Sequence, residues 1–228
     1  MTRNRLIHAA TLAVGLWLGL GAAVTHATAL FNVTVDTTSI SGGTYSVAFD
    51  LTDGDSVTNN TVSVSNFVFN GGGITGVPNL TGGASGELNS TVSLMDTVFF
   101  NSFDQQFTAG NLLSFTIDIS SNFGGGSPDN FAFYLLDDKG DTITTTDPFG
   151  TNSFFTIDLQ DPLIIQTFSS IDANQLIPAP VVAQVVEAPE PSLFSLLVLG
   201  LAGMLASRRI MPSGDKVALR VETFFKKL

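Results

Sequence analysis

Apolar and polar side chains alternate with a period of two through much of the chain between residues 30 and 171. The clearest examples are residues 31–36, 45–51 and 114–119. This period predicts β-strands that place one face on an apolar core and the other face in water. No window between the two ends of the chain has the 3.6-residue period of an amphipathic helix.

Two departures from this alternation carry further information. In residues 62–69 the apolar positions are even at first and then include odd ones, so we expect a β-bulge near Ser65 or Asn66. Residues 131–136 are apolar at both parities, which predicts a central strand that is covered on both sides. We expect further strands in four shorter stretches: residues 87–94, 103–107, 154–159 and 163–168.

Glycine-rich turns separate the predicted strands, for example at Gly42-Gly43, Asp53-Gly54 and residues 71–73. About nine or ten short strands with such turns predict an all-β domain over residues 30–172, an antiparallel β-sandwich that is jelly-roll-like. The chain contains 19 Phe and no Cys. Because Phe buries a large apolar area, such a domain can form its core without disulfides.

The first 29 residues have the order of parts found in a secretory signal peptide. Arg3 and Arg5 precede an apolar stretch at residues 6–24, and small residues follow at Ala27 and Ala29. We therefore expect an N-terminal signal helix that signal peptidase removes after Ala29. Cleavage after Ala27 and retention as an N-terminal anchor are the alternatives.

The chain behind the predicted domain reads as a linker followed by a hydrophobic segment. Residues 173–188 contain two Pro and alternating Val and Ala, which predicts an extended linker of up to roughly 50 Å. Residues 193–206 are apolar and uncharged, and as a helix they would reach roughly 21 Å, less than the roughly 30 Å of a hydrocarbon core. We expect a temporary membrane span, with Arg208 and Arg209 on the cytoplasmic side and the domain outside that membrane.

The order of residues in this C-terminal segment resembles a known sorting signal. Pro189, Glu190 and Pro191 precede the apolar run, and Arg208 and Arg209 follow it. These parts, over residues 189–209, are similar to the PEP-CTERM sorting domain of Gram-negative bacteria that make exopolysaccharide. The resemblance implies cleavage by exosortase, a membrane transpeptidase-like enzyme; an ordinary C-terminal membrane anchor is the alternative. The family usually ends soon after its Arg cluster, whereas this chain continues as a basic cytoplasmic tail at residues 210–228.

The predicted domain also resembles a recurrent ectodomain pattern of PEP-CTERM proteins. The resemblance rests on residues 59–73, 82–86, 99–101, 128–131 and 135–137. That pattern implies no activity, so it supports the domain boundaries alone.

Charge and residue content exclude several function classes. Between Leu30 and Glu190 the chain has 18 Asp and Glu and one basic residue, Lys139. A domain with this excess of negative charge repels nucleic-acid phosphates and attracts cations. His8 and His26 both precede the expected cleavage site, so the mature domain would have neither His nor Cys. Ser-His-Asp and Cys-His catalysis and His-ligated zinc or iron are thereby excluded.

Three carboxylates stand close together in the sequence at Asp50, Asp53 and Asp55. Oxygen ligands on a flexible Gly-containing turn suit calcium. Asp-Gly is also common turn chemistry with no ion, and we prefer this second interpretation. We therefore expect no cofactor, with calcium as the alternative.

Two hypotheses about function follow from the sequence. The first is an exported, exosortase-sorted protein of the cell surface or extracellular matrix, with a non-catalytic β-sandwich and an association with exopolysaccharide or biofilm. Its partners would be signal peptidase, exosortase, the inner membrane before processing, and exopolysaccharide, but no nucleic acid. The alternative is a carbohydrate-active enzyme that uses paired carboxylates. We prefer the first, because no carboxylate pair stands out in the sequence.

Overall fold

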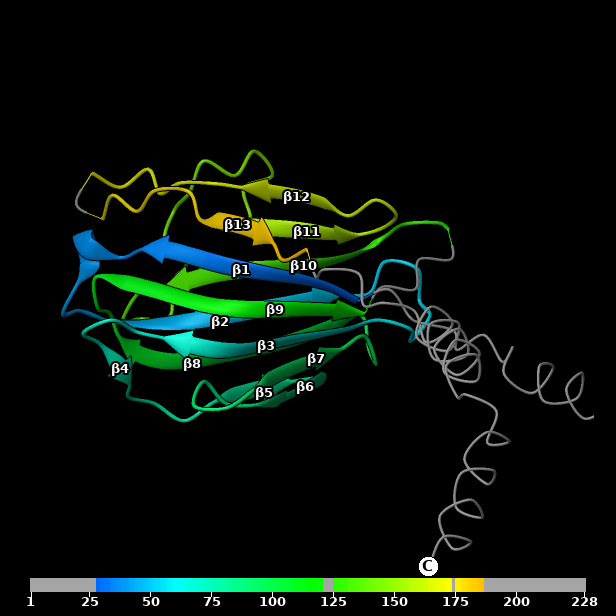
Figure 1. The fold of residues 1–228 in the computed structure, drawn as a ribbon, viewed down its shortest axis with the longest axis horizontal. Coiled ribbons are helices and arrows are strands. Elements are labelled where there is room, and N and C mark those ends of the chain that lie inside the picture. Colours follow the sequence, from blue (N-terminus) through cyan, green and yellow to red (C-terminus); the bar gives the residue numbers. More distant parts are fainter. Residues whose placement is uncertain (1–27, 121–124, 174, 187–228) are drawn as a thin grey trace, which may run out of the picture. The chain divides into compact units, whose positions relative to one another are not determined.

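The computed structural model describes residues 28–120, 125–173 and 175–186, and this part of the chain is almost entirely β-structure (Figure 1). Its only helix is a single 3-10 turn, η1 (Thr38–Ile40). Thirteen strands form two antiparallel sheets. The prediction of an all-β antiparallel domain is therefore confirmed, while both expected terminal helices lie outside the described residues.

The six-stranded sheet has the order β13-β1-β9-β3-β7-β6. In that order its strands are β13 (Val181–Gln184), β1 (Thr28–Asp36), β9 (Leu112–Ser120), β3 (Thr61–Val68), β7 (Val92–Met95) and β6 (Gly83–Gly86).

The seven-stranded sheet has the order β12-β11-β10-β2-β8-β4, and β5 pairs separately with β8. Its strands are β12 (Ile164–Thr167), β11 (Phe155–Leu159), β10 (Asp129–Leu136), β2 (Thr44–Thr52), β8 (Phe100–Thr108), β4 (Gly73–Ile74) and β5 (Asn79–Thr81).

One apolar core lies between the two sheets, and Phe side chains dominate it. Phe49 on β2 is fully buried, and its ring centroid lies 5.4 Å from that of Phe115 on β9 of the other sheet. Phe133 on β10 lies at the same distance from Phe115. The core residues of β2 are those that the alternation predicts, because every second side chain of a strand points to the same face.

The predicted irregularities of two strands are both present. The register between β3 and β9 shifts between Ser65 and Val68, and Asn66 has a left-handed φ of 56°. The expected bulge is therefore confirmed. Strand β10 lies between β11 and β2, and its outward-facing Ala132 is only 3% exposed. The predicted central position of β10 is therefore confirmed, whereas its outer face is buried only at Ala132 and half-buried at Asn130, Tyr134 and Leu136.

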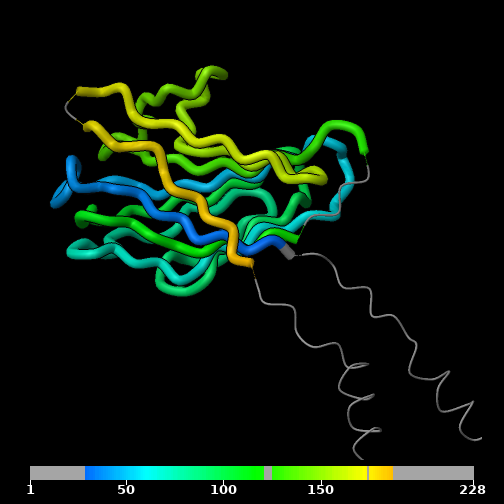
Figure 2. The backbone as a smooth tube through the Cα atoms, turned by 45° about the horizontal axis from the view of Figure 1, so that its top comes forward, coloured from blue at the N-terminus to red at the C-terminus, as the bar shows by residue number. Residues whose placement is uncertain are grey.

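Part of the expected linker belongs to the folded domain. Ile177 is fully buried, and β13 pairs with β1 through the register Phe31↔Gln184 to Thr34↔Val181. Figure 2 shows this strand, in orange, beside β1, in blue. A free spacer over residues 173–188 is thus not what the structure has, because backbone hydrogen bonds hold residues 181–185 on the sheet edge.

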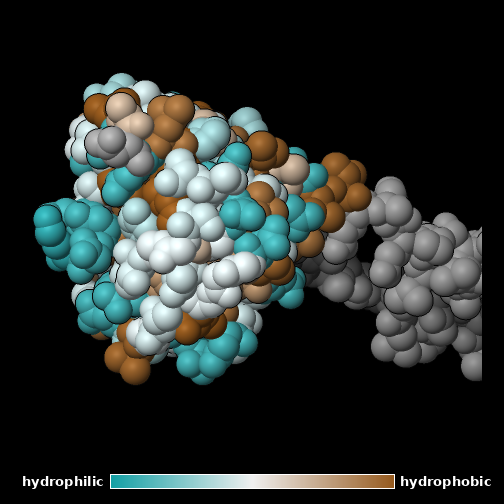
Figure 3. All heavy atoms as spheres, turned by 90° about the vertical axis from the view of Figure 1, so that its left-hand side faces the viewer, coloured by the Kyte–Doolittle hydropathy of each residue, from teal (hydrophilic) through white to brown (hydrophobic). Residues whose placement is uncertain are grey.

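Both ends of the described domain lie at the same end of the sheets. Thr28 opposes Ser120 on β9, and Ser120 also opposes Thr61 at the start of β3. The Val185 N–H donates to the Leu30 carbonyl oxygen at 2.8 Å. The opposite end, which carries η1, presents polar and neutral side chains around separate apolar spots (Figure 3). Among the described residues, no helix is long and apolar enough to cross a membrane.

Candidate functional site

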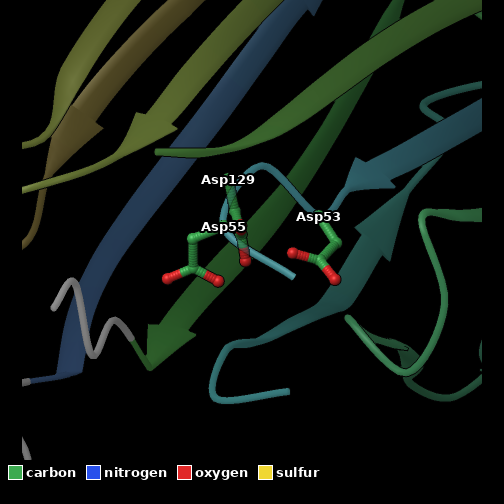
Figure 4. A group of neighbouring side chains, drawn as sticks. All are labelled: Asp53, Asp55 and Asp129. Atoms are coloured by element: carbon green, nitrogen blue, oxygen red, sulfur yellow. The ribbon is translucent and has the colours of Figure 1, made fainter. Parts of the chain in front are cut away.

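Three carboxylates converge where the chain crosses from one sheet to the other. Asp53 and Asp55 follow β2, in the connection to β3, and both are half-buried. Asp129 is the first residue of β10 and is 2% exposed. One carboxylate oxygen from each residue lies within 4.8 Å of the other two. Figure 4 shows the three side chains turned toward one another.

Gly54 allows this convergence because the backbone of the β2–β3 connection approaches β10 very closely. A Cβ at Gly54 would stand 2.3 Å from the carbonyl oxygen of Pro128, a distance that no side chain tolerates. The Gly54 N–H donates to Asp129 Oδ1 at 2.7 Å. The sequence predicts a turn glycine at this position, but the close approach to Pro128 is what requires Gly54.

The expected turn contacts are also present. The backbone N–H of Ser56 donates to Asp53 Oδ1 at 2.6 Å. The backbone N–H of Val57 donates to Asp55 Oδ1 at 2.8 Å. Each contact occupies one oxygen of its carboxylate, so the turn and an ion do not compete for the same atoms.

Asp50 does not belong to this group. It lies on the outer face of β2, opposite Ser102 on β8. Burial raises the pKa of Asp50 and the charge of nearby Asp104 raises it further, while a hydrogen bond with Ser102 opposes the rise. The structure therefore separates Asp50 from Asp53 and Asp55, because β2 ends at Thr52 and the other two carboxylates lie in the loop that follows.

A fourth carboxylate, Asp96, adjoins the group from the other sheet. It follows β7, is 1% exposed, and its Oδ2 accepts the backbone N–H groups of Asn59 and Asn60, each at 2.9 Å. Its Oδ1 is buried and has no hydrogen-bond donor among the described residues. The Asn60 side chain donates to Asp129 Oδ2 at 2.8 Å, so one residue connects both buried carboxylates.

The two buried carboxylates influence each other. Burial raises the pKa of Asp129, and the neighbouring Asp96 carboxylate raises it further. The hydrogen bonds from Asn60 and Gly54 act in the opposite direction. Asp129 is therefore costly to hold in its ionised form.

No basic side chain of the described part of the chain compensates this charge. Lys139 is the only Lys or Arg in that part, and it lies in the turn after β10. Asp129 begins β10, so the strand separates the two. Backbone hydrogen bonds, chiefly from Asp141, lower the pKa of Asp137, and the Lys139 charge contributes to the same effect.

Asp96 and Asp129 stand far from Asp53 in the sequence, so the spacing of residues does not reveal them as neighbours of Asp53. Each adjoins a strand end, and antiparallel neighbours bring such ends together. Asn130 opposes Thr52, which places Asp129 beside the residues that follow β2. A search for Asp at the ends of predicted neighbouring strands is the signal that would have found it.

The predicted sorting and processing residues are largely outside the described part. Pro189, Glu190, Pro191, Arg208, Arg209 and Ala27 lie outside the described residues. Ala29 lies in β1 and opposes Ile119 of β9.

Comparison of the chain with protein-family models, with curated proteins and with solved structures finds no match in any of the three.

Proposed function

We propose that the chain is an exported, exosortase-sorted protein of the cell surface or extracellular matrix. Its domain would be a non-catalytic, jelly-roll-like β-sandwich associated with exopolysaccharide or biofilm. The observation that carries the proposal is the order Pro189-Glu190-Pro191, apolar run and Arg208-Arg209 directly behind a folded β domain. A domain followed by such a tail is the arrangement that cell-surface sorting requires.

The arrangement of the domain's ends supports this proposal. Strand β13 is held on β1 up to the Val185 N–H, so the chain leaves the domain shortly before Pro189. The first described residues, on β1, lie at the same end. A domain attached at one end only leaves its remaining surface available to solvent and to a surrounding matrix.

The absence of catalytic residue types supports a non-catalytic domain. Residues 28–186 contain no His and no Cys, and the one Glu before residue 187, Glu87, is exposed in a turn. General acid–base chemistry near neutral pH most often uses a His, and this stretch has none. The surface carries many carboxylates and would be strongly hydrated.

A carboxylate-dependent carbohydrate-active enzyme is the second candidate, and one observation favours it. Asp50 and Asp104 lie on neighbouring strands of the outer face of the seven-stranded sheet, and the pKa of Asp50 is raised, first by burial and then by Asp104. A glycosidase requires one carboxyl group with such a raised pKa beside an ionised one.

The sorting proposal is tested by single substitutions at two acidic residues of the same segment. We expect Glu190→Ala to leave an uncleaved, membrane-retained form in a host that has exosortase, because it alters the recognised tripeptide. Glu187→Ala removes the same charge outside the tripeptide and should be processed as the parent is. Equal processing of both variants and the parent would overturn the proposal.

The non-catalytic proposal is tested on the host's own polysaccharide. We expect no release of reducing sugar by the purified protein. Release that is lost in both Asp50→Asn and Asp104→Asn would establish the enzyme instead. Asp118→Asn is the control, because Asp118 is exposed on the outer face of the other sheet.

A further inference from the structure

Two buried carboxylates lie side by side at one end of the domain, and no Lys or Arg of the described residues compensates their charge. Asp96 and Asp129 are 1% and 2% exposed, and Asn60 hydrogen-bonds to both. The buried Oδ1 of Asp96 has no donor among the described residues. A carboxylate oxygen removed from water without a partner is strongly unfavourable, so this pair requires either a proton or a cation.

The geometry around the pair favours a cation. Oxygens of Asp53, Asp55 and Asp129 lie within 4.8 Å of one another. Calcium holds its oxygen ligands at about 2.3–2.6 Å, so two oxygens on one ion are at most about 5 Å apart. A shared proton would explain Asp96 and Asp129, but it would not explain why two further carboxylates point to the same place.

We propose that Asp53, Asp55 and Asp129, whose carboxylates converge, form a calcium site at this end of the domain, and that Asp96, which adjoins Asp129, completes it as a fourth ligand. The proposal does not rest on export or sorting of the chain. It also differs from the set suggested by sequence spacing, because it excludes Asp50 and includes two residues from distant strands.

Each carboxylate retains the atoms that the ion needs. Asp53 and Asp55 each use one oxygen for a turn contact and keep the second oxygen. Asp129 accepts one hydrogen bond on each oxygen, and a carboxylate has about four lone-pair positions. Asp96 offers the unpartnered Oδ1.

The ligand set fits calcium better than magnesium. Calcium accepts six to eight oxygens in irregular arrangements, whereas magnesium requires near-octahedral geometry and usually keeps several waters. Four protein carboxylates, two of them buried, form an irregular and highly charged cage. We therefore expect calcium to bind more tightly than magnesium.

A bound ion would join the two sheets. Asp129 begins β10 and Asp53 and Asp55 follow β2, all from the seven-stranded sheet, while Asp96 follows β7 of the six-stranded sheet. These residues are distant in the sequence and converge only in the folded chain. An ion that binds the folded state alone raises the melting temperature, Tm, by mass action.

Asp96→Asn tests the site through opposite effects with and without the ion. The Asn Oδ1 keeps the two contacts to the N–H groups of Asn59 and Asn60, while its Nδ2 replaces the unpartnered oxygen and donates to Asp129. We expect this variant to have a higher Tm than the parent when calcium is removed with EGTA. Because an amide nitrogen does not bind calcium, the variant should show no gain in Tm when calcium is added.

The experiment uses the full chain in detergent, with calcium chloride or magnesium chloride as the probe. At a free calcium concentration ten times Kd, we expect the parent Tm to rise by about 3–6 °C. Asp55→Asn should lose most of this rise. Asp118→Asn removes one exposed charge outside the site and should keep it. Isothermal titration of the EGTA-treated protein should give one calcium per chain for the parent and for Asp118→Asn.

Three results would overturn the proposal. The first is a parent Tm that does not respond to millimolar calcium, the range in which extracellular calcium modules bind. The second is an equal calcium response in Asp96→Asn and the parent, which would show that the ion binds elsewhere on the acidic surface. The third is a Tm that rises as the pH falls and does not change with calcium, which would show that a shared proton, and no cation, stabilises Asp96 and Asp129.

Discussion

At the scale of single residues, two buried carboxylates, Asp147 and Asp129, differ in the direction in which their surroundings shift the pKa. Asp147 is 7% exposed and accepts the Phe149 N–H at 2.9 Å and the Ser153 hydroxyl at 3.1 Å, together with the Thr151 hydroxyl. Burial opposes ionisation, yet these hydrogen bonds lower the pKa of Asp147 overall. The hydrogen bonds of Asp147 thus stabilise its own loop, whereas burial and the neighbouring Asp96 keep the pKa of Asp129 raised.

Tyr134 provides a prediction about pH at the same scale. Burial, with a further contribution from Asp50, raises the pKa of Tyr134 to about 12. The folded state therefore favours the neutral phenol. The stability from this group is fully present below the ordinary Tyr pKa of about 10 and is lost as the pH rises toward 12. We expect Tm to fall over this range, and Tyr134→Phe should reduce the fall.

Absorbance of the phenolate checks the same prediction directly. The chain has two Tyr, so Tyr45→Phe leaves Tyr134 as the only phenol to titrate. A titration midpoint near pH 10 in folded Tyr45→Phe would contradict the prediction.

At the scale of elements, strands with clear alternation were predictable and short strands were not. Strands β1, β2 and β9 have nine residues each, and the period of two is visible throughout their length. Strands β4, β5 and β6 have only two to four residues each, too few for any period to appear. Strand β13 has three exposed residues out of four, so backbone pairing with β1 holds it rather than an apolar pattern.

The candidate site was predictable only where its residues are neighbours in the sequence. Asp53 and Asp55 share one loop and were found. Asp96 and Asp129 come from two other places in the chain, and only the pairing of strands brings them near. Spacing along the sequence placed Asp50 among the calcium candidates, because the sequence alone does not show that β2 ends at Thr52, after Asp50.

The extension of the domain beyond residue 172 leads to a prediction about two adjacent residues. Ile177 is fully buried, and its N–H donates to Ser170 Oγ at 2.7 Å, whereas Leu176 is 64% exposed. We expect Ile177→Ala to lower the free energy of unfolding of the full chain by about 2–4 kcal/mol, because it leaves a cavity in the core. Leu176→Ala should change it by less than about 0.5 kcal/mol. Chemical denaturation measures both, and similar effects would mean that this stretch is a free linker.

At the scale of the whole molecule, the chain between residues 30 and 190 has 18 acidic residues and one basic residue. Such an excess of one sign destabilises a compact state through repulsion among its own charges. The Phe-rich core between the sheets opposes this repulsion without any disulfide, since the chain has no Cys. Stability should therefore depend on the ions in solution in two ways, through general screening and through the proposed calcium site.

Sodium chloride separates general screening from calcium binding. The screening length falls from about 30 Å at 0.01 M salt to about 8 Å at 0.15 M. We expect the Tm of the EGTA-treated full chain to rise across this range, because the exposed carboxylates repel one another less.

Asp118 provides a variant that tests this repulsion. It is exposed on β9, and its cross-strand neighbours Leu30 and Ser63 are uncharged, so its electrostatic energy reflects the summed charge of the domain and no single ion pair. Asp118→Asn should weaken the dependence on salt, and Asp118→Lys should weaken it further, each by about 0.5 kcal/mol or less. A Tm that falls with added sodium chloride, or a steeper dependence in Asp118→Lys than in the parent, would show that self-repulsion does not limit the stability of this domain.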